Sequence, residues 1–136
     1  MNQQNRSSSS IDELNALSSK IIGSAIEVHK ELGPGLLESV YEICLSKELL
    51  SRNINFERQI FLPVLYKEEE LNLSFRMDLL VNDEIVLELK AIDRILPVHE
   101  AQLLTYLKLS GKRLGLVINF NEAVLRNGIR RMLNGY

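Results

Sequence analysis

The stretch that most constrains the fold is Phe75–Ala91, FRMDLLVNDEIVLELKA, in which apolar and polar residues alternate. Such alternation indicates half-buried β-strands, because successive side chains point to opposite faces of a sheet. The polar residues Asn82–Glu84 separate two alternating runs. Asn and Asp tolerate the left-handed conformation that a tight turn needs. We therefore predict an antiparallel hairpin.

The length of the connection decides which side chains of this hairpin share a face. A two-residue turn, Asn82–Asp83, would place Asp78 opposite Leu87, among apolar groups. A three-residue connection leaves one face wholly apolar, and its pairs are Val81–Ile85, Leu79–Leu87, Met77–Leu89 and Phe75–Ala91. The opposite face then carries the pairs Leu80–Val86, Asp78–Glu88 and Arg76–Lys90. Because a slip of one residue moves every side chain to the wrong face, the pattern selects the three-residue connection.

This register brings two carboxylates together. Asp78 would lie opposite Glu88, with Lys90 on the same side. Two carboxylates roughly 5 Å apart repel by about 3 kcal/mol at an effective dielectric near 20. A divalent cation reverses that repulsion, since hard cations take carboxylate oxygens as ligands. The pattern Asp-x9-Glu-x-Lys therefore suits a Mg²⁺-dependent phosphodiesterase. The alternative is a solvated outer face on which Glu88 and Lys90 are surface charges.

Length and composition indicate a single soluble domain. The 136 residues are enough for a sizeable core, and 46% hydrophobic with 25% charged residues is ordinary for a globular protein. Cys44 is the only cysteine, which rules out an internal disulfide and favours a reducing, cytoplasmic compartment. Residues 1–10 lack the apolar segment of a signal peptide, and we predict a disordered tail there and a folded domain over residues 11–136. No run is long enough to cross a membrane.

The charge is unevenly distributed. The net charge of −2 argues against a generally basic nucleic-acid binder, yet residues 101–136 carry 6 basic residues and a single acid. This basic segment could meet a phosphate backbone. It could equally be solvated surface and charge at the end of a helix.

The remaining periodicities predict a mixed α/β fold. We expect one long helix or two shorter ones over residues 11–32, ended by Gly33-Pro34-Gly35, and then the elements helix 36–51, strand 54–66, strand 71–81, strand 84–91, helix 98–110, strand 114–118 and helix 123–133. A strand, a helix and a buried strand in succession imply a right-handed crossover. The predicted order is ααβββαβα.

Several other residues could carry chemistry. Glu38 and Tyr41 share a helix face, although an acid in the first helical turn also simply complements the helix dipole. His29 and His99 have no Cys or His at ligand spacing, so we expect surface or packing roles. Cys44 is expected in the core. The chain has no glycine-rich phosphate loop, so no nucleotide cofactor is expected.

Together with the motifs below, these residues make the chain resemble a known family. GLLESVY at Gly35–Tyr41 matches the GxxExxY signature of a family of small bacterial and archaeal proteins, placed in the PD-(D/E)XK nuclease superfamily. The resemblance extends over residues 21–133 and includes VHEAQLLTYLKL and GLVINF. It implies a restriction-endonuclease-like core of order αβββαβ, a mixed and mainly antiparallel sheet flanked by helices. Met77 departs from the pattern, because the superfamily has proline before the aspartate.

The resemblance also implies roles for individual residues. Asp78 and Glu88 would be the metal ligands and Lys90 the catalytic lysine. Glu38 would add a further acid, as a metal ligand or through water. Gln102 and Tyr106 look like a Q-x3-Y element, with Gln102 near the metal and Tyr106 near the substrate. We add Arg76 as a phosphate contact, with an ion pair to a nearby acid as the alternative.

These roles imply a Mg²⁺- or Mn²⁺-dependent nuclease that hydrolyses phosphodiester bonds in nucleic acid, with DNA favoured over RNA and no membrane partner. A homodimer would enlarge the surface that so small a domain presents to a duplex. The alternative is a non-catalytic nucleic-acid-binding or protein-interaction module that keeps the nuclease fold. The resemblance does not decide between them, because a fold does not fix a function.

Overall fold

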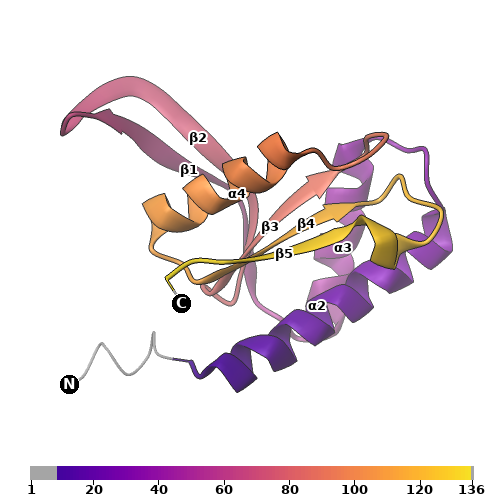
Figure 1. Ribbon diagram of the computed structural model, residues 1–136. Helices are drawn as coiled ribbons and strands as arrows, with labels where there is room; N and C mark the ends of the chain where they lie inside the picture. Colours follow the sequence, from indigo (N-terminus) through magenta and orange to yellow (C-terminus); the bar gives the residue numbers. More distant parts are fainter. Residues whose placement is uncertain (1–8, 136) are drawn as a thin grey trace.

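A mixed β-sheet with helices on both faces forms the body of the protein (Figure 1). The computed structural model describes residues 9–135. The five strands of its sheet lie in chain order: β1 (Phe56–Tyr66), β2 (Glu69–Val81), β3 (Ile85–Lys90), β4 (Leu114–Asn119) and β5 (Ile129–Leu133). Strands β3 and β4 are parallel and the other neighbours are antiparallel. The predicted fold class, with its αβββαβ core, is confirmed.

Two apolar clusters pack on opposite faces of the sheet. One joins the sheet to α2 (Ile11–Leu32) and α3 (Glu38–Ser51), and the other joins it to α4 (Pro97–Ser110). Alternate residues of the central strands enter different clusters: Leu116 of β4 faces α2 and α3, while Val117 faces α4. Every residue of β4 is buried, as the continuous apolar run predicted. In residues 9–135, no helix is both long enough and apolar enough to cross a bilayer.

The helix ends follow the predicted signals. Gly111 ends α4 in the left-handed conformation, with φ 71°, and Pro97 occupies its first turn. His99 Nδ1 accepts the Leu96 N–H at 2.9 Å, and His29 Nε2 lies 2.7 Å from the Glu122 carbonyl oxygen. Both histidines thus bond to the backbone.

The predicted disordered tail falls largely outside the described residues. Residues 1–8 are not described, whereas Ser10 is the N-cap of α2. Its hydroxyl accepts the Glu13 N–H at 3.0 Å, and its own N–H donates to Glu13 Oε1 at 2.8 Å. This reciprocal capping box satisfies N–H groups that would have no partner inside the helix.

The predicted C-terminal helix over residues 123–133 is wrong. A short 3₁₀ helix, η1 (Leu125–Gly128), leads instead into β5, which pairs with the free edge of β4. Gly128 lies so close to β4 that a Cβ there would come within 2.6 Å of the Asn119 carbonyl oxygen. Asn127-Gly128 is a turn signal that a helical reading overlooks. One basic residue of this segment, Arg130 of β5, forms an ion pair with Glu100 of α4 at 3.5 Å.

The loop before α3 is fixed by a buried tyrosine. Tyr41 stacks on Phe120 with ring centroids 4.5 Å apart, and its side chain is fully buried. Its hydroxyl donates to the Gly33 carbonyl oxygen at 2.6 Å and accepts the Leu36 N–H at 3.1 Å. Between these residues Gly35 turns the chain with φ 99°, a conformation that suits glycine. The tyrosine therefore sets where α3, and with it Glu38, begins.

We predict that Tyr41→Phe lowers the free energy of unfolding by about 1–3 kcal/mol, because the Gly33 carbonyl and the Leu36 N–H lose their buried partner while the stacked ring remains. Urea denaturation followed by circular dichroism measures the change. Tyr66→Phe, at an exposed tyrosine, is the matched control and should leave stability within about 0.5 kcal/mol. Equal stability of the two variants would contradict this role for the hydroxyl.

Candidate metal and phosphate site

The hairpin of β2 and β3 has the predicted three-residue connection but pairs over a shorter length than predicted. Val81–Ile85, Leu80–Val86 and Leu79–Leu87 are partners, and Asn82 and Asp83 take positive φ values of 53° and 58° in the turn. The predicted pairs beyond them, Asp78–Glu88, Arg76–Lys90, Met77–Leu89 and Phe75–Ala91, are not strand partners among residues 9–135. The strands separate at the two acids.

Side chains replace the missing ladder at this point. The Asp78 N–H donates to Glu88 Oε2 at 3.0 Å, and the Leu89 N–H donates to Asp78 Oδ2 at 2.8 Å. Each carboxylate thus bridges to the opposite strand with one oxygen. The other oxygen of each accepts no hydrogen bond from residues 9–135. Two carboxylate oxygens therefore remain available for a cation or water in the gap between the strands.

The strand also changes faces here, which the sequence pattern did not predict. Leu79 packs with the cluster of α2 and α3, but Met77 packs with the cluster of α4. Residues two apart share a face in a regular strand, so β2 is distorted at Asp78. On β1, Gln59 lies between Arg58 and Ile60, which are the strand partners of Leu79 and Met77, and it takes φ 55°. The predicted apolar face of Phe75, Met77, Leu79 and Val81 is therefore split between two cores.

This distortion opens a pocket of about 400 Å³. It is lined by Glu38, Phe61, Ser74, Phe75, Arg76, Asp78, Glu88, Lys90, Gln102 and Tyr106. All seven predicted site residues are among them, contributed by both helical layers and by β2 and β3. The structure thus brings the predicted residues together, while their individual roles stay predictions.

The pocket contains two cations without an ion pair. Neither Lys90 nor Arg76 has a carboxylate within 4.0 Å among residues 9–135. The ion pair considered as an alternative for Arg76 is therefore not formed in that part of the chain. Both cations remain free to meet a phosphate.

Burial changes the protonation of the acids. Burial first, and then the neighbouring Asp78 carboxylate, raise the pKa of Glu88 to about 8. Burial also raises the pKa of Asp78, although the hydrogen bond from Leu89 opposes the shift. Burial and the two carboxylates raise the pKa of Tyr106, whose ring lies 5.6 Å from that of Phe75. At neutral pH the acid pair therefore retains a proton, which a cation would displace.

One positioning group was missed by the sequence analysis. Glu42, one turn after Glu38 on α3, is buried; Arg58 Nε donates to its Oε2 at 3.0 Å, and the Gln59 amide donates to both of its oxygens at 2.8 Å. These contacts hold Gln59 in its left-handed conformation beside Asp78. The i,i+4 spacing of Glu38 and Glu42 was the available signal, since such residues share a helix face.

Asn119 is a second missed residue, at the end of β4. Its Oδ1 accepts the Ile92 N–H at 3.0 Å, and its Nδ2 donates to the Ile92 carbonyl oxygen at 2.9 Å. The Phe120 N–H donates to the Lys90 carbonyl oxygen at 2.9 Å. The segment that carries Lys90 is thereby fixed to the parallel neighbour strand. A polar residue that ends a buried apolar run was its only signal in the sequence.

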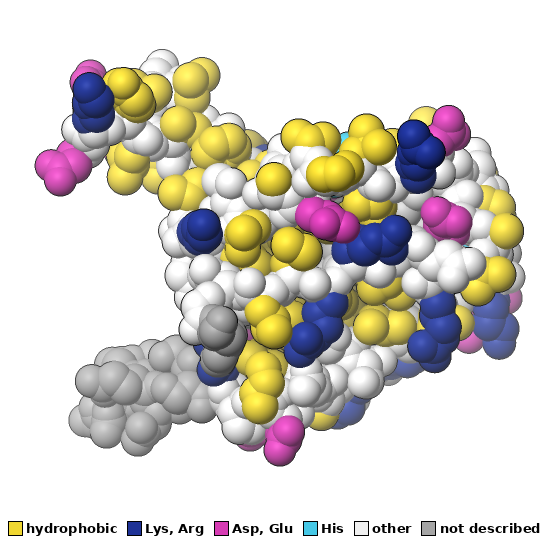
Figure 2. Space-filling view, viewed as in Figure 1, with side chains coloured by type: hydrophobic (Ala, Val, Ile, Leu, Met, Phe, Trp, Pro, Cys, Tyr) yellow, Lys and Arg dark blue, Asp and Glu magenta, His cyan; other side chains and the backbone are white. Residues whose placement is uncertain are grey.

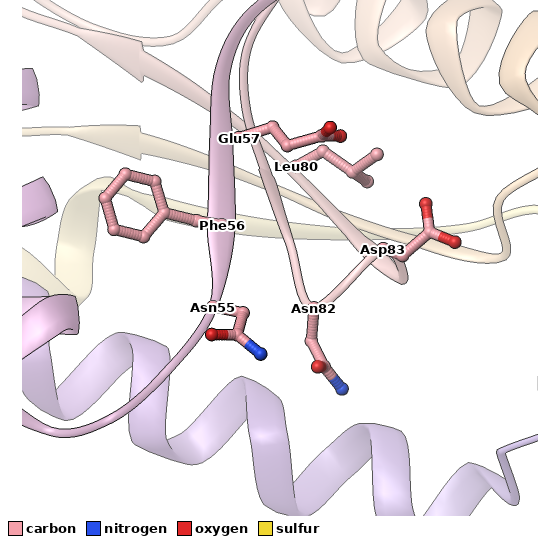
Figure 3. A pocket seen from close by; sticks show the side chains of 6 residues that line it. All are labelled: Asn55, Phe56, Glu57, Leu80, Asn82 and Asp83. Carbon is pink, nitrogen blue, oxygen red and sulfur yellow. The ribbon is translucent and has the colours of Figure 1, made fainter.

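A separate hollow of about 430 Å³ lies where β1 begins and β2 ends (Figure 3). It is lined by Asn55, Phe56, Glu57, Leu80, Asn82 and Asp83, none of which is a predicted site residue. Phe56 points to the side away from Glu57 and Asp83 (Figure 3). Asp83 is already paired with Lys112 at 3.2 Å. We therefore place the functional site at the gap between β2 and β3.

Comparison with known proteins places the chain in a family. The sequence profile of the PD-(D/E)XK nuclease superfamily matches residues 15–132. The chain belongs to the PD-(D/E)XK nuclease superfamily. The fold is similar to the crystal structure of SSO0001, with a TM-score of 0.53 and 20% identity over 73% of this chain. The match covers 51% of that protein, so this chain corresponds to about half of its length. No curated protein matches the sequence.

Nucleases of this superfamily generally use divalent metals such as Mg²⁺. The donors here fit such an ion, because two carboxylate oxygens are left free at a pocket in which the side chain of Glu88 is itself buried. Within residues 9–135, no three Asp, Glu, His or Cys side chains converge closely enough to hold an ion. Glu38 lines the pocket without joining the acid pair, and its role as a ligand stays a prediction.

We predict that stability falls as pH rises in the absence of metal. The pKa of Glu88 is about 8 in the folded protein and 4.5 as its reference value, so between these pH values the folded state holds a proton that the unfolded state has lost. Folding is therefore favoured at low pH. Because each unit of pKa shift corresponds to about 1.4 kcal/mol, the free energy of unfolding should fall by a few kcal/mol as the pH rises between these two values. Glu88→Gln removes this dependence.

Urea denaturation at pH 5.5 and pH 8.5 with chelator measures both proteins. The stability difference between Glu88→Gln and the unaltered chain should shift in favour of the variant at the higher pH. The same pH dependence in both proteins would show that Glu88 does not titrate in this window.

We predict that Gln59→Ala destabilises by about 1–3 kcal/mol, because Glu42 loses its amide donor. Gln59→Gly should destabilise less, since glycine removes the roughly 1–2 kcal/mol strain of a left-handed residue. Urea denaturation of both variants gives the order. Equal losses would contradict the view that the hydrogen bonds to Glu42 hold a strained backbone.

Proposed function

We propose that the protein is a metal-dependent nuclease that hydrolyses phosphodiester bonds in nucleic acid, with DNA as the preferred substrate. The observation that carries the proposal is the gap between β2 and β3. There, the paired acids Asp78 and Glu88 present free oxygens into a pocket that also contains the cations Lys90 and Arg76. Membership of the nuclease superfamily supports the same reaction class.

Asp78 and Glu88 would hold the Mg²⁺ or Mn²⁺ ion. Glu38 and a backbone carbonyl, which we assign to Leu89, would complete the site. When bound, the ion would lower the pKa of a water molecule and neutralise charge on the phosphate. Before the ion binds, the raised pKa of Glu88 keeps a proton on the acid pair and limits the repulsion between the two carboxylates.

The other pocket residues act on the phosphate and the water. The Lys90 ammonium, two residues after Glu88, would place the attacking water and stabilise the negative charge that develops on the phosphate. Arg76 would bind a phosphate oxygen, since a guanidinium offers several donors to one phosphate. Gln102 would orient a water or a ligand, and Tyr106 would contact the substrate.

Three narrower parts of the proposal rest mainly on the sequence. Membership of the GxxExxY family is supported by the turn at Gly35, by Glu38 in the pocket and by the hydrogen bond from Tyr41 to the loop before α3. The single cysteine supports a cytoplasmic location. A homodimer would present a larger surface to a duplex.

A binding module without catalysis is the second candidate. It is favoured by the absence, within residues 9–135, of a third acid converging on Asp78 and Glu88. Such a protein would bind nucleic acid but would not cleave it, and Lys90 would have no catalytic role.

We predict that Asp78→Asn and Lys90→Ala each reduce Mn²⁺-dependent cleavage by at least about 10²-fold, the usual effect of removing one group that stabilises a transition state. Single- and double-stranded DNA and RNA with end labels, resolved on denaturing gels, measure the rates. Lys108→Ala, at an exposed lysine of α4, is the matched control and should cleave normally. Unchanged cleavage by Asp78→Asn and Lys90→Ala would end the assignment.

A further inference from the structure

An exposed aromatic residue stands beside the acid pair. Phe61 of β1 is 65% exposed, yet it lines the same pocket as Asp78 and Glu88. It is the strand partner of Arg76, so its ring and the guanidinium project from neighbouring positions on one face. The cores described above do not include Phe61, whereas its neighbours Ile60 and Leu62 pack with the α4 cluster. Packing therefore gives no reason for an aromatic ring at this position.

Beyond the body of the protein, the end of the β1–β2 hairpin projects as an arm (Figure 1). A second hollow, of about 570 Å³, lies beside the pocket and shares Phe61 and Ser74 with it. Figure 2 shows hydrophobic side chains along this arm, which is the projecting end of the β1–β2 hairpin, and charged side chains at its end. The exposed apolar residues there include Leu65, Tyr66 and Leu73. An open path thus leads from the acid pair past Phe61.

The charges decide what can follow this path. Arg76 lies opposite Phe61, so a phosphate can be bound next to the ring. The end of the arm is net acidic, with Glu68, Glu69 and Glu70 against the single Lys67, and repels a phosphate backbone. The attractive region is therefore short. It suits one nucleotide, whose base stacks on an aromatic face while its phosphate meets a cation.

We propose that Phe61 is a stacking platform for an unpaired base adjacent to the phosphodiester bond that is cut. The inference rests on the proposed nuclease function and specifies its substrate as nucleic acid that is single-stranded or locally unpaired at this nucleotide. In an intact duplex the bases are stacked on each other, and one must leave the stack to meet a protein side chain.

The chain has no tryptophan, so Phe61→Trp introduces a single fluorescent reporter at the platform. The probe is a short oligothymidine with a terminal fluorescein, which is mixed rapidly with protein and Mg²⁺. The anisotropy of the fluorescein reports binding. Quenching of the tryptophan fluorescence by the same oligothymidine without fluorescein reports stacking. We expect quenching by oligothymidine but not by an abasic strand of equal length. Phe61→Ala should weaken binding by about 5- to 150-fold, the effect of losing one stacked base, and Phe61→Tyr should retain it.

Tyr66→Trp is the positional control, because Tyr66 is 61% exposed on the same arm and Lys67 Nζ already lies 5.5 Å from its ring centroid. It should not be quenched. Binding by anisotropy with an unquenched Phe61→Trp variant, or equal affinity of Phe61→Ala and the unaltered chain, would overturn the stacking site while leaving the nuclease proposal intact. If neither cleavage nor binding of any nucleic acid is observed, both proposals fail.

Discussion

The structure depends on an interruption in a β-sheet. Between β2 and β3 the backbone ladder ends where Asp78 and Glu88 begin, and each carboxylate takes a backbone N–H of the other strand as its partner. A backbone donor left without a partner would be unfavourable in a buried place. The acids satisfy these donors and at the same time are held close together, in a pocket that raises their pKa values. The same two side chains therefore stabilise the backbone at the gap and form the candidate metal site.

The surrounding elements fix this gap from several sides. Tyr41 sets the start of α3, Asn119 holds the segment after Lys90, and Glu42 holds Gln59 next to Asp78. Glu42 and Asn119 were not singled out from the sequence, and Tyr41 was noted there only as part of the GxxExxY signature and as a neighbour of Glu38 on one helix face. They determine where the chemical groups stand, and substitutions at them should disturb the site without removing any group that touches the substrate. Phe61, on the open side, is the one aromatic residue among the described residues lining the pocket that is largely exposed to solvent.

The sequence was sufficient for the order of the core elements and for seven residues that the structure brings into one pocket, although their roles stay predictions. Alternation over Phe75–Ala91 predicted the hairpin and its turn because a slipped register would expose its apolar face. It could not predict the distortion at Asp78, since the left-handed Gln59 that accompanies it lies on the neighbouring strand and is distant in sequence. The C-terminal strand was missed because the free edge of β4 is a tertiary feature, which outweighs a weak local periodicity over residues 123–133.

The central claim is that the acid pair binds a divalent cation, and calorimetric titration with Mn²⁺ tests it most directly. Parallel titrations of the unaltered chain and of Asp78→Asn at pH 7, in two buffers with different ionisation enthalpies, separate binding from proton release. We expect saturable binding by the unaltered chain, with protons released because the pKa of Glu88 is about 8, and much weaker binding by the variant. No binding by the unaltered chain, or equal affinity in the variant, would contradict the account.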